Sequence, residues 1–143
     1  MIDTNAVIRT HLAADAGITA LVGDRIYQGR LPENADLPAI CFFTRGGTST
    51  PYIPGIPAPS VQFDCWAKSE EVAGVEIKGD IVARQVYRAL YDALQGIQNV
   101  KVTIGATDYY ILSAIEEVQG QDLVDSEIPN YYRVLTFFEI MVR

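Results

Sequence analysis

Residues 61–68 read Val-Gln-Phe-Asp-Cys-Trp-Ala-Lys, and this stretch decides the fold of the chain. Apolar and polar side chains alternate along it, which predicts a β-strand with one face buried in a core. The apolar face carries Val61, Phe63, Cys65 and Ala67, and the other face carries Gln62, Asp64, Trp66 and Lys68. Trp66 interrupts the polar face, so we expect that face to be covered, either by this chain or by another one.

A second long strand is predicted over 131–142, Tyr-Tyr-Arg-Val-Leu-Thr-Phe-Phe-Glu-Ile-Met-Val. Large apolar side chains lie on both of its faces, whereas a strand with one solvated face alternates between apolar and polar residues. Either the strand is central and covered on both sides within the subunit, or its second face meets another chain. We favour the second explanation, which makes four residues candidates for a subunit interface: Trp66, Leu135, Phe137 and Met141.

Two helical segments are predicted on either side of residues 61–68. The N-terminal segment 3–22 has apolar residues at helical spacing. Ser69 is predicted to cap a long helix, with Glu70 and Glu71 in its first turn, where the helix dipole favours carboxylates. Two glycines weaken its first half, so residues 80–95 are its firmest part.

The remaining patterns complete one domain over residues 1–143. Further strands are predicted over 25–28, 39–45, 99–104 and 108–118, and an acidic loop over 119–130. The resulting order α-β-β-β-α-β-β-β contains no β-α-β alternation. We therefore expect an α+β fold, with a mostly antiparallel sheet and an N-terminal helix and one long helix packed on one face.

The segment 46–60 holds four of the seven prolines of the chain. Proline fixes φ and removes a backbone donor, so the segment is predicted to be an extended loop and neither a helix nor a central strand. Such long connections are usually functional or disordered. Its apolar residues Tyr52, Ile53 and Ile56 are candidates for docking onto a partner.

Composition excludes several classes of function. The chain has 143 residues and a formal net charge of −7. This negative charge is unfavourable for binding nucleic acid, because such binding depends on Lys and Arg side chains that neutralise phosphates. No apolar run approaches the roughly 18 residues of a membrane span, and no secretory signal is evident. Cys41 and Cys65 lie in apolar runs and are predicted to be buried free thiols in a reducing compartment.

No pattern predicts an enzyme or a cofactor. His11 is the only histidine, and the sequence contains no phosphate-binding glycine motif, no nucleophile elbow and no Cys/His pair. Carboxylates gather within 108–132, a span without Lys or Arg, but their spacing matches no calcium loop. We predict no metal there, and interpret the span as a solvated loop or as a deliberately negative surface.

Three stretches in order resemble a known family. These are Leu-Val-Gly-Asp-Arg-Ile-Tyr at 21–27, Leu-Pro-Ala-Ile at 37–40 and Val-Gln-Phe-Asp-Cys-Trp-Ala at 61–67, followed by the closing aromatic strand. Together they look like the phage tail-completion family, the tail-terminator or tail-to-head joining proteins of long-tailed phages and prophages. The resemblance spans nearly the whole chain, although the proline-rich stretch at 51–59 is longer than such connections usually are.

The resemblance implies a structural role in the virion tail, after assembly in the host cytoplasm. Members form a ring, typically a hexamer, at the head-proximal end of the tail tube, where they stop tube growth and join the head connector or stopper. DNA passes through the bore without specific binding, and no catalytic residues are implied. In such a ring the acidic residues Glu116, Glu117, Asp122, Asp125 and Glu127 are candidates for lining the channel, although an outer rim fits their composition equally well.

One alternative from another class of protein stays open. The chain is then a cytosolic α+β domain that binds a small molecule, in a pocket between the sheet face and the 46–60 loop. Ring formation in solution distinguishes the two hypotheses.

Overall fold

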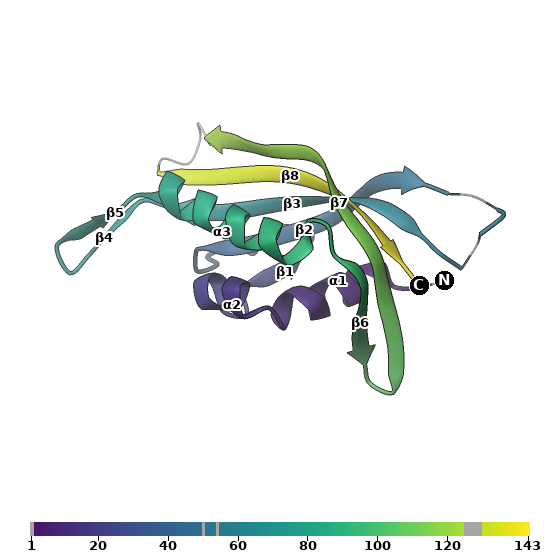
Figure 1. Cartoon of the computed structure of the whole chain (residues 1–143). Helices are drawn as coiled ribbons and strands as arrows, with labels where there is room; N and C mark the ends of the chain where they lie inside the picture. Colours follow the sequence, from purple (N-terminus) through teal and green to yellow (C-terminus); the bar gives the residue numbers. More distant parts are fainter. Residues whose placement is uncertain (1, 50, 54, 125–129) are drawn as a thin grey trace.

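A mixed six-stranded sheet forms the centre of the described residues, which in this computed structural model are 2–49, 51–53, 55–124 and 130–143 (Figure 1). The strand order is β1-β2-β3-β8-β7-β6, and every pairing is antiparallel except that of β1 with β2. The strands are β1 (Ile26–Gln28), β2 (Ala39–Thr48), β3 (Ala58–Lys68), β6 (Gln98–Ile104), β7 (Thr107–Val124) and β8 (Tyr131–Val142). The α+β class, the mostly antiparallel sheet and the strand at 131–142 are confirmed.

The N-terminal helical segment is two helices, α1 (Thr4–Ala13) and α2 (Ala16–Val22). Aspartate begins each of them: the Asp3 carboxylate accepts from the Ala6 amide at 3.2 Å, and that of Asp15 accepts from the Ile18 amide at 3.0 Å. The second cap lies inside the segment 3–22, and it marks the point where the chain turns between the two helices.

The long helix α3 (Gly79–Leu94) starts at Gly79 rather than at Glu70, nine residues later than predicted. Residues 70–77 form a hairpin instead, with strands β4 (Glu70–Val72) and β5 (Val75–Ile77). Ala73 and Gly74 both have positive φ, 53° and 79°, as a tight two-residue hairpin turn requires. Ser69 still caps the helix, because its hydroxyl accepts from the Gly79 amide at 2.9 Å across the base of the hairpin.

The proline-rich loop is shorter than predicted. Strands β2 and β3 extend into it from both sides, so that Gly47 pairs with Pro59 and Thr48 with Ala58. The register shifts between Thr44 and Gly47, and a bulged strand end is a place where a sheet tolerates proline.

The predicted acidic loop is also shorter, because β7 continues to Val124. Beyond residue 113, β7 pairs with β8 alone and forms an edge. Side chains of α3 and its C-cap occupy this edge: the Glu116 amide donates to Gln95 Oε1 at 2.7 Å, and the Gly120 amide donates to the Tyr87 hydroxyl at 3.2 Å. A Cβ at Gly120 would lie 2.7 Å from the Tyr87 ring, so only glycine admits the tyrosine here.

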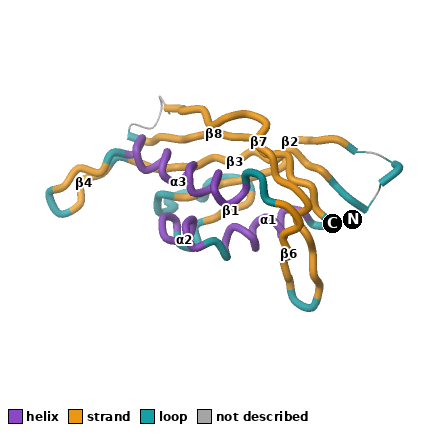
Figure 2. The backbone as a smooth tube through the Cα atoms, viewed as in Figure 1, coloured by secondary structure: helices purple, strands orange, loops and turns teal. Residues whose placement is uncertain are grey.

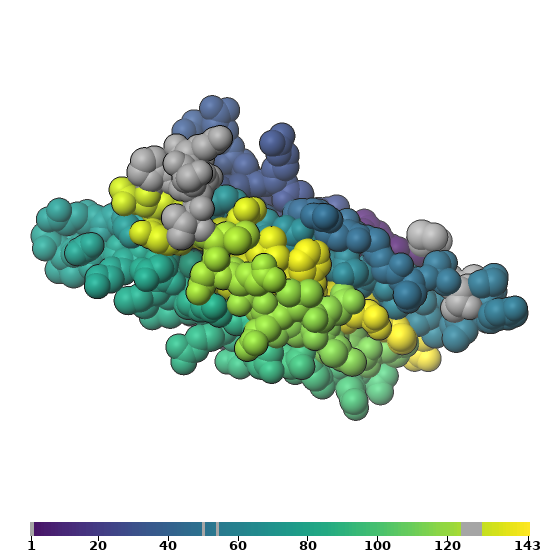
Figure 3. Space-filling model, turned by 90° about the horizontal axis from the view of Figure 1, so that it is seen from above, coloured from purple at the N-terminus to yellow at the C-terminus, as the bar shows by residue number. Residues whose placement is uncertain are grey.

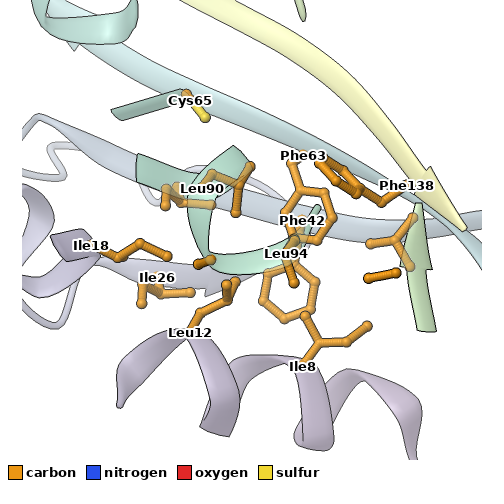
Figure 4. Packing of buried hydrophobic residues seen from close by; sticks show 14 of the residues in the cluster. Ile8, Leu12, Ile18, Ile26, Phe42, Phe63, Cys65, Leu90, Leu94 and Phe138 are labelled. Carbon is orange, nitrogen blue, oxygen red and sulfur yellow. The ribbon is translucent and has the colours of Figure 1, made fainter. Parts of the chain in front are cut away.

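The core lies between one face of the sheet and the three helices of the described residues (Figures 1 and 2). Phe63 stands at its centre, stacked on Phe42 and edge-on to Phe138, with both pairs of ring centroids 5.8 Å apart (Figure 4). Ile8 and Leu12 of α1 and Leu90 and Leu94 of α3 close the other side and are fully buried.

The two cysteines and the histidine have structural positions. Cys41 and Cys65 are free and buried, as predicted, and burial raises the pKa of the Cys41 thiol to about 12. His11 Nε2 lies 3.0 Å from the Ala93 carbonyl oxygen and joins α1 to α3. None of the helices in the described ranges is long and apolar enough to cross a bilayer.

Candidate functional site

All described helices pack against one face of the sheet, and the opposite face carries no helix; Figure 3 is viewed from above this opposite face. Side chains of β8 alternate between the two faces, with Val134, Phe138 and Ile140 buried toward the helices. Their neighbours on the helix-free face are half-buried: Arg133, Leu135, Phe137, Glu139 and Met141. No helix therefore covers the interface candidates of β8, and Trp66 lies beside Arg133 in register on the same face.

A polar network crosses the centre of this face. Arg45 Nη1 donates to Gln62 Oε1 at 2.9 Å, and Gln62 Nε2 donates to Asp64 Oδ1 at 3.0 Å. The second carboxylate oxygen of Asp64 lies 3.7 Å from Arg133 Nη1. Gln62 and Asp64 are each 5% exposed, so these polar groups are satisfied inside the protein rather than by bulk water.

Burial raises the pKa of Asp64, and the hydrogen bond from Gln62 and the charges of Arg133 and Arg45 oppose that rise. A carboxylate on an outward sheet face is ordinarily solvated. Its burial here shows that the neighbouring side chains exclude water from this carboxylate.

The two arginines of this polar network also cover aromatic rings. The Arg45 guanidinium carbon lies 5.8 Å from the Phe43 ring centroid, and that of Arg133 lies 5.1 Å from the Trp66 centroid. The face therefore combines flat apolar area with fixed positive charge, a composition enriched at protein interfaces. Sequence reasoning missed Arg45, although a charged residue at the end of a largely apolar strand, two positions after Phe43, was the available signal.

The segment 29–35 rises beside this face and turns it into a groove of about 950 Å³. Its wall includes Arg30, Leu31, Glu33 and Ala35, and its floor includes Phe43, Arg45, Gln62, Asp64, Trp66 and Arg133. We call this hollow the outer groove. None of the described residues of the 46–60 segment lines this groove. The wall that was expected for a small-molecule pocket is therefore formed by residues 29–35 instead.

The proposed docking residues lie at the free end of the β2–β3 hairpin, at the right of Figure 1. Tyr52 is 91% and Ile53 is 52% exposed, and Ile56 is half-buried. Ile53 and Ile56 border a smaller hollow of about 340 Å³ that also includes Ile2.

The acidic channel candidates do not form one cluster in the described residues. Glu116 is half-buried and accepts hydrogen bonds from the Tyr87 hydroxyl and from Thr136 Oγ1, both at 2.7 Å. Asp122 pairs with Arg84 of α3 at 2.8 Å. Glu117 accepts from the Ser60 hydroxyl at 2.6 Å. Asp125 and Glu127 lie outside the described residues.

The described residues contain no group of three or more His, Cys, Asp or Glu placed to hold a metal ion. What the geometry offers instead is a large helix-free surface with arginines, aromatic rings and half-buried aliphatic side chains. Such a surface is suited to binding protein.

Comparison with known families agrees with this character. Residues 6–137 match the family model described as tail completion protein gp17. The chain belongs to the tail completion protein gp17 family. This tail completion protein is therefore a structural protein of a phage-type tail, as the resemblance implied.

A solved structure shares the fold of this tail completion protein. It is a chain of a structure titled "Virion of native gene transfer agent (GTA) particle", with a TM-score of 0.63 and 15% sequence identity. The match covers 96% of this chain and 92% of that one, so the whole domain is shared. Comparison with curated proteins gives no significant match.

Proposed function

We propose that this protein forms a ring at the head-proximal end of a phage tail tube, where it terminates the tube and joins it to the head connector or stopper. The observation that carries the proposal is the family match over residues 6–137. The role is structural, and no catalytic step is assigned to any side chain.

The helix-free face supports self-association. Leu135, Phe137 and Met141 lie half-buried on it in the isolated subunit, and Trp66 lies on the same face opposite Arg133. In a cyclic assembly each subunit uses one surface toward the preceding neighbour and another toward the next, and the ring closes when the rotation allows. A hexamer is the ring size that we propose.

The other contacts follow from the position in the tail. The exposed β2–β3 tip, with Tyr52, Ile53 and Ile56, docks onto the tail tube or the connector. The net charge of −7 per subunit keeps the bore from holding DNA as it passes. Among the acidic candidates, Glu117 and Asp122 are exposed, and we retain them as channel-lining residues.

Complementation of particles that lack this protein tests the proposal. Without it, electron microscopy should show tails that are not joined to heads, and the wild-type gene should restore joined tails with a ring at the tail end. Phe137→Asp should fold but fail to restore them, because a desolvated unpaired charge in a contact costs several kcal/mol. Normal joined tails in the absence of the protein would contradict the proposal.

The small-molecule-binding alternative is favoured only by the volume of the outer groove. It predicts a monomer whose thermal stability rises with a metabolite extract. The ring proposal predicts no such rise.

A further inference from the structure

The β4–β5 hairpin projects from one end of the molecule, at the left of Figure 1, and its strands pair only with each other among the described residues. An isolated two-stranded hairpin is at best marginally stable in water. This one also exposes apolar area, since Val72 is 49% and Val75 is 65% exposed. Its composition and position both indicate a segment that is stabilised by a partner.

The two faces of the hairpin differ. Val72 pairs with Val75 on one face, and Glu71 pairs with Glu76 on the other. Carboxylates directly opposite each other destabilise a strand pair through repulsion. A cation placed between Glu71 and Glu76 removes that repulsion, so the acidic face is suited to receive a Lys or Arg from another surface.

The outer groove offers the complementary chemistry. Arg30, Arg45 and Arg133 line it, against the acids Glu33 and Asp64. Two of these arginines already contact Gln62 or Asp64. Arg30 is exposed and makes no hydrogen bond or ion pair with the part of the chain that the structure describes. In a chain of net charge −7, this groove is a locally basic surface with an aromatic floor.

We propose that the β4–β5 hairpin of one subunit docks into the outer groove of the next copy of the same chain. Glu71 and Glu76 bracket the Arg30 guanidinium, and the valine face covers the floor near Phe43 and Trp66. Hairpin and groove are different surfaces, so the contact is head-to-tail and generates a ring when it closes. This inference rests on the proposed ring and specifies its subunit contact.

Disulfide trapping in assembled particles tests the contact directly. Val75→Cys combined with Ala35→Cys should yield, on oxidation, a ladder of covalent multimers up to the full ring. The native thiols do not compete, because Cys41 and Cys65 are buried. Each single variant should give no ladder beyond a dimer. Ala106→Cys with Ala35→Cys is the matched control, since Ala106 is exposed at the tip of a different hairpin, and it should give none.

Charge exchange tests the pairing independently. Glu71→Arg with Glu76→Arg should weaken assembly at least about tenfold, which is the low end for close interfacial charge pairs. Adding Arg30→Glu should restore assembly. Asp92→Arg, at an exposed position on α3, changes the net charge in the same direction and should have no effect.

The outcomes separate the two proposals. Rings that form without a covalent ladder in the Val75→Cys, Ala35→Cys double variant, or with an equal ladder in the Ala106→Cys control, would overturn the hairpin contact and leave the proposed function standing. Cross-linking of the Val75→Cys variant to the tube protein would overturn it in the same way. Absence of any ring at the tail end would overturn both.

Discussion

The same strands present two different surfaces on the two sides of the sheet. Toward the helices, Phe63 and Phe138 are fully buried in an apolar core. On the other side, the neighbours of these residues are Gln62, a buried Asp64 and the half-buried Phe137. The first surface is complete within one subunit. The second surface stays partly exposed to solvent. Its hydrogen bonds and ion pair hold the arginines in place, but no helix covers the arginines or the aromatic rings. The apolar core accounts for the stability of the subunit, and the proposed associations of the subunit use the other face.

The largest effect on stability is expected at the core. Phe63→Ala should lower the free energy of unfolding by about 3–5 kcal/mol, because it removes a ring that contacts Phe42 and Phe138 and leaves a cavity. Urea unfolding of the monomer measures this loss. A change below about 1 kcal/mol would show that the core is not organised around this ring.

Phe137→Ala is the matched substitution on the other face. The side chain is half-buried in the isolated subunit, so the loss should be only about 1 kcal/mol. Ring formation, measured by analytical ultracentrifugation, should be impaired far more than folding. Equal losses of stability for Phe137→Ala and Phe63→Ala would contradict the division between the two faces.

A smaller effect, dependent on pH, is expected at Asp64. Burial raises its pKa above the ordinary value near 3.8, so the native state binds more protons than the unfolded chain between the two pKa values. The stability contributed by Asp64 is therefore highest below the ordinary pKa and is lost as the pH rises through the raised one.

Asp64→Asn keeps an acceptor for Gln62 but removes this titration. The stability of the variant relative to wild type should increase as the pH rises through that window and level off above it. Urea unfolding at several pH values, under conditions where the protein is monomeric, measures the difference. Parallel pH profiles for the two proteins would contradict the assignment.

The smallest effect on stability is expected at the β2–β3 tip. Replacing residues 51–56 with a Gly-Ser linker should change the free energy of unfolding by less than about 0.5 kcal/mol, because Tyr52 and Ile53 are exposed. Tail joining should nevertheless fail in the complementation assay. The same replacement of the β6–β7 turn at 105–106 is the control and should leave joining intact.

The sequence predicted the elements whose patterns are local. Strict alternation identified 61–68 and the strand at 131–142, and the apolar runs around Cys41 and Cys65 identified buried thiols. The helix start was misplaced because Ser69 is a genuine cap, yet it reaches the Gly79 amide across a hairpin rather than along the chain. A side chain caps a helix when its oxygen lies close to the first free amides of that helix. The spacing of residues along the sequence does not show whether the oxygen lies there.

The remaining differences come from contacts distant in sequence. Residues 119–124 are polar enough for a loop, but pairing with β8 makes them a strand. The outer groove joins 29–35 to β2, β3 and β8, an arrangement that no single segment encodes. That the helices pack on one face was predicted from the order of the elements. The apolar residues Trp66, Phe137 and Met141 on the other face predict an interface, which stays a prediction.

The free edge of β7, beyond residue 113, is poorly suited to pairing with a strand from another molecule. Its ladder with β8 shifts register between Glu116 and Val118 and again between Val118 and Gln121, while Gln95 and Tyr87 occupy two of its outward amides. An edge in this state gives an incoming strand no continuous row of donors and acceptors to copy. We therefore expect copies of this protein not to extend one another's sheet into a fibre along this edge.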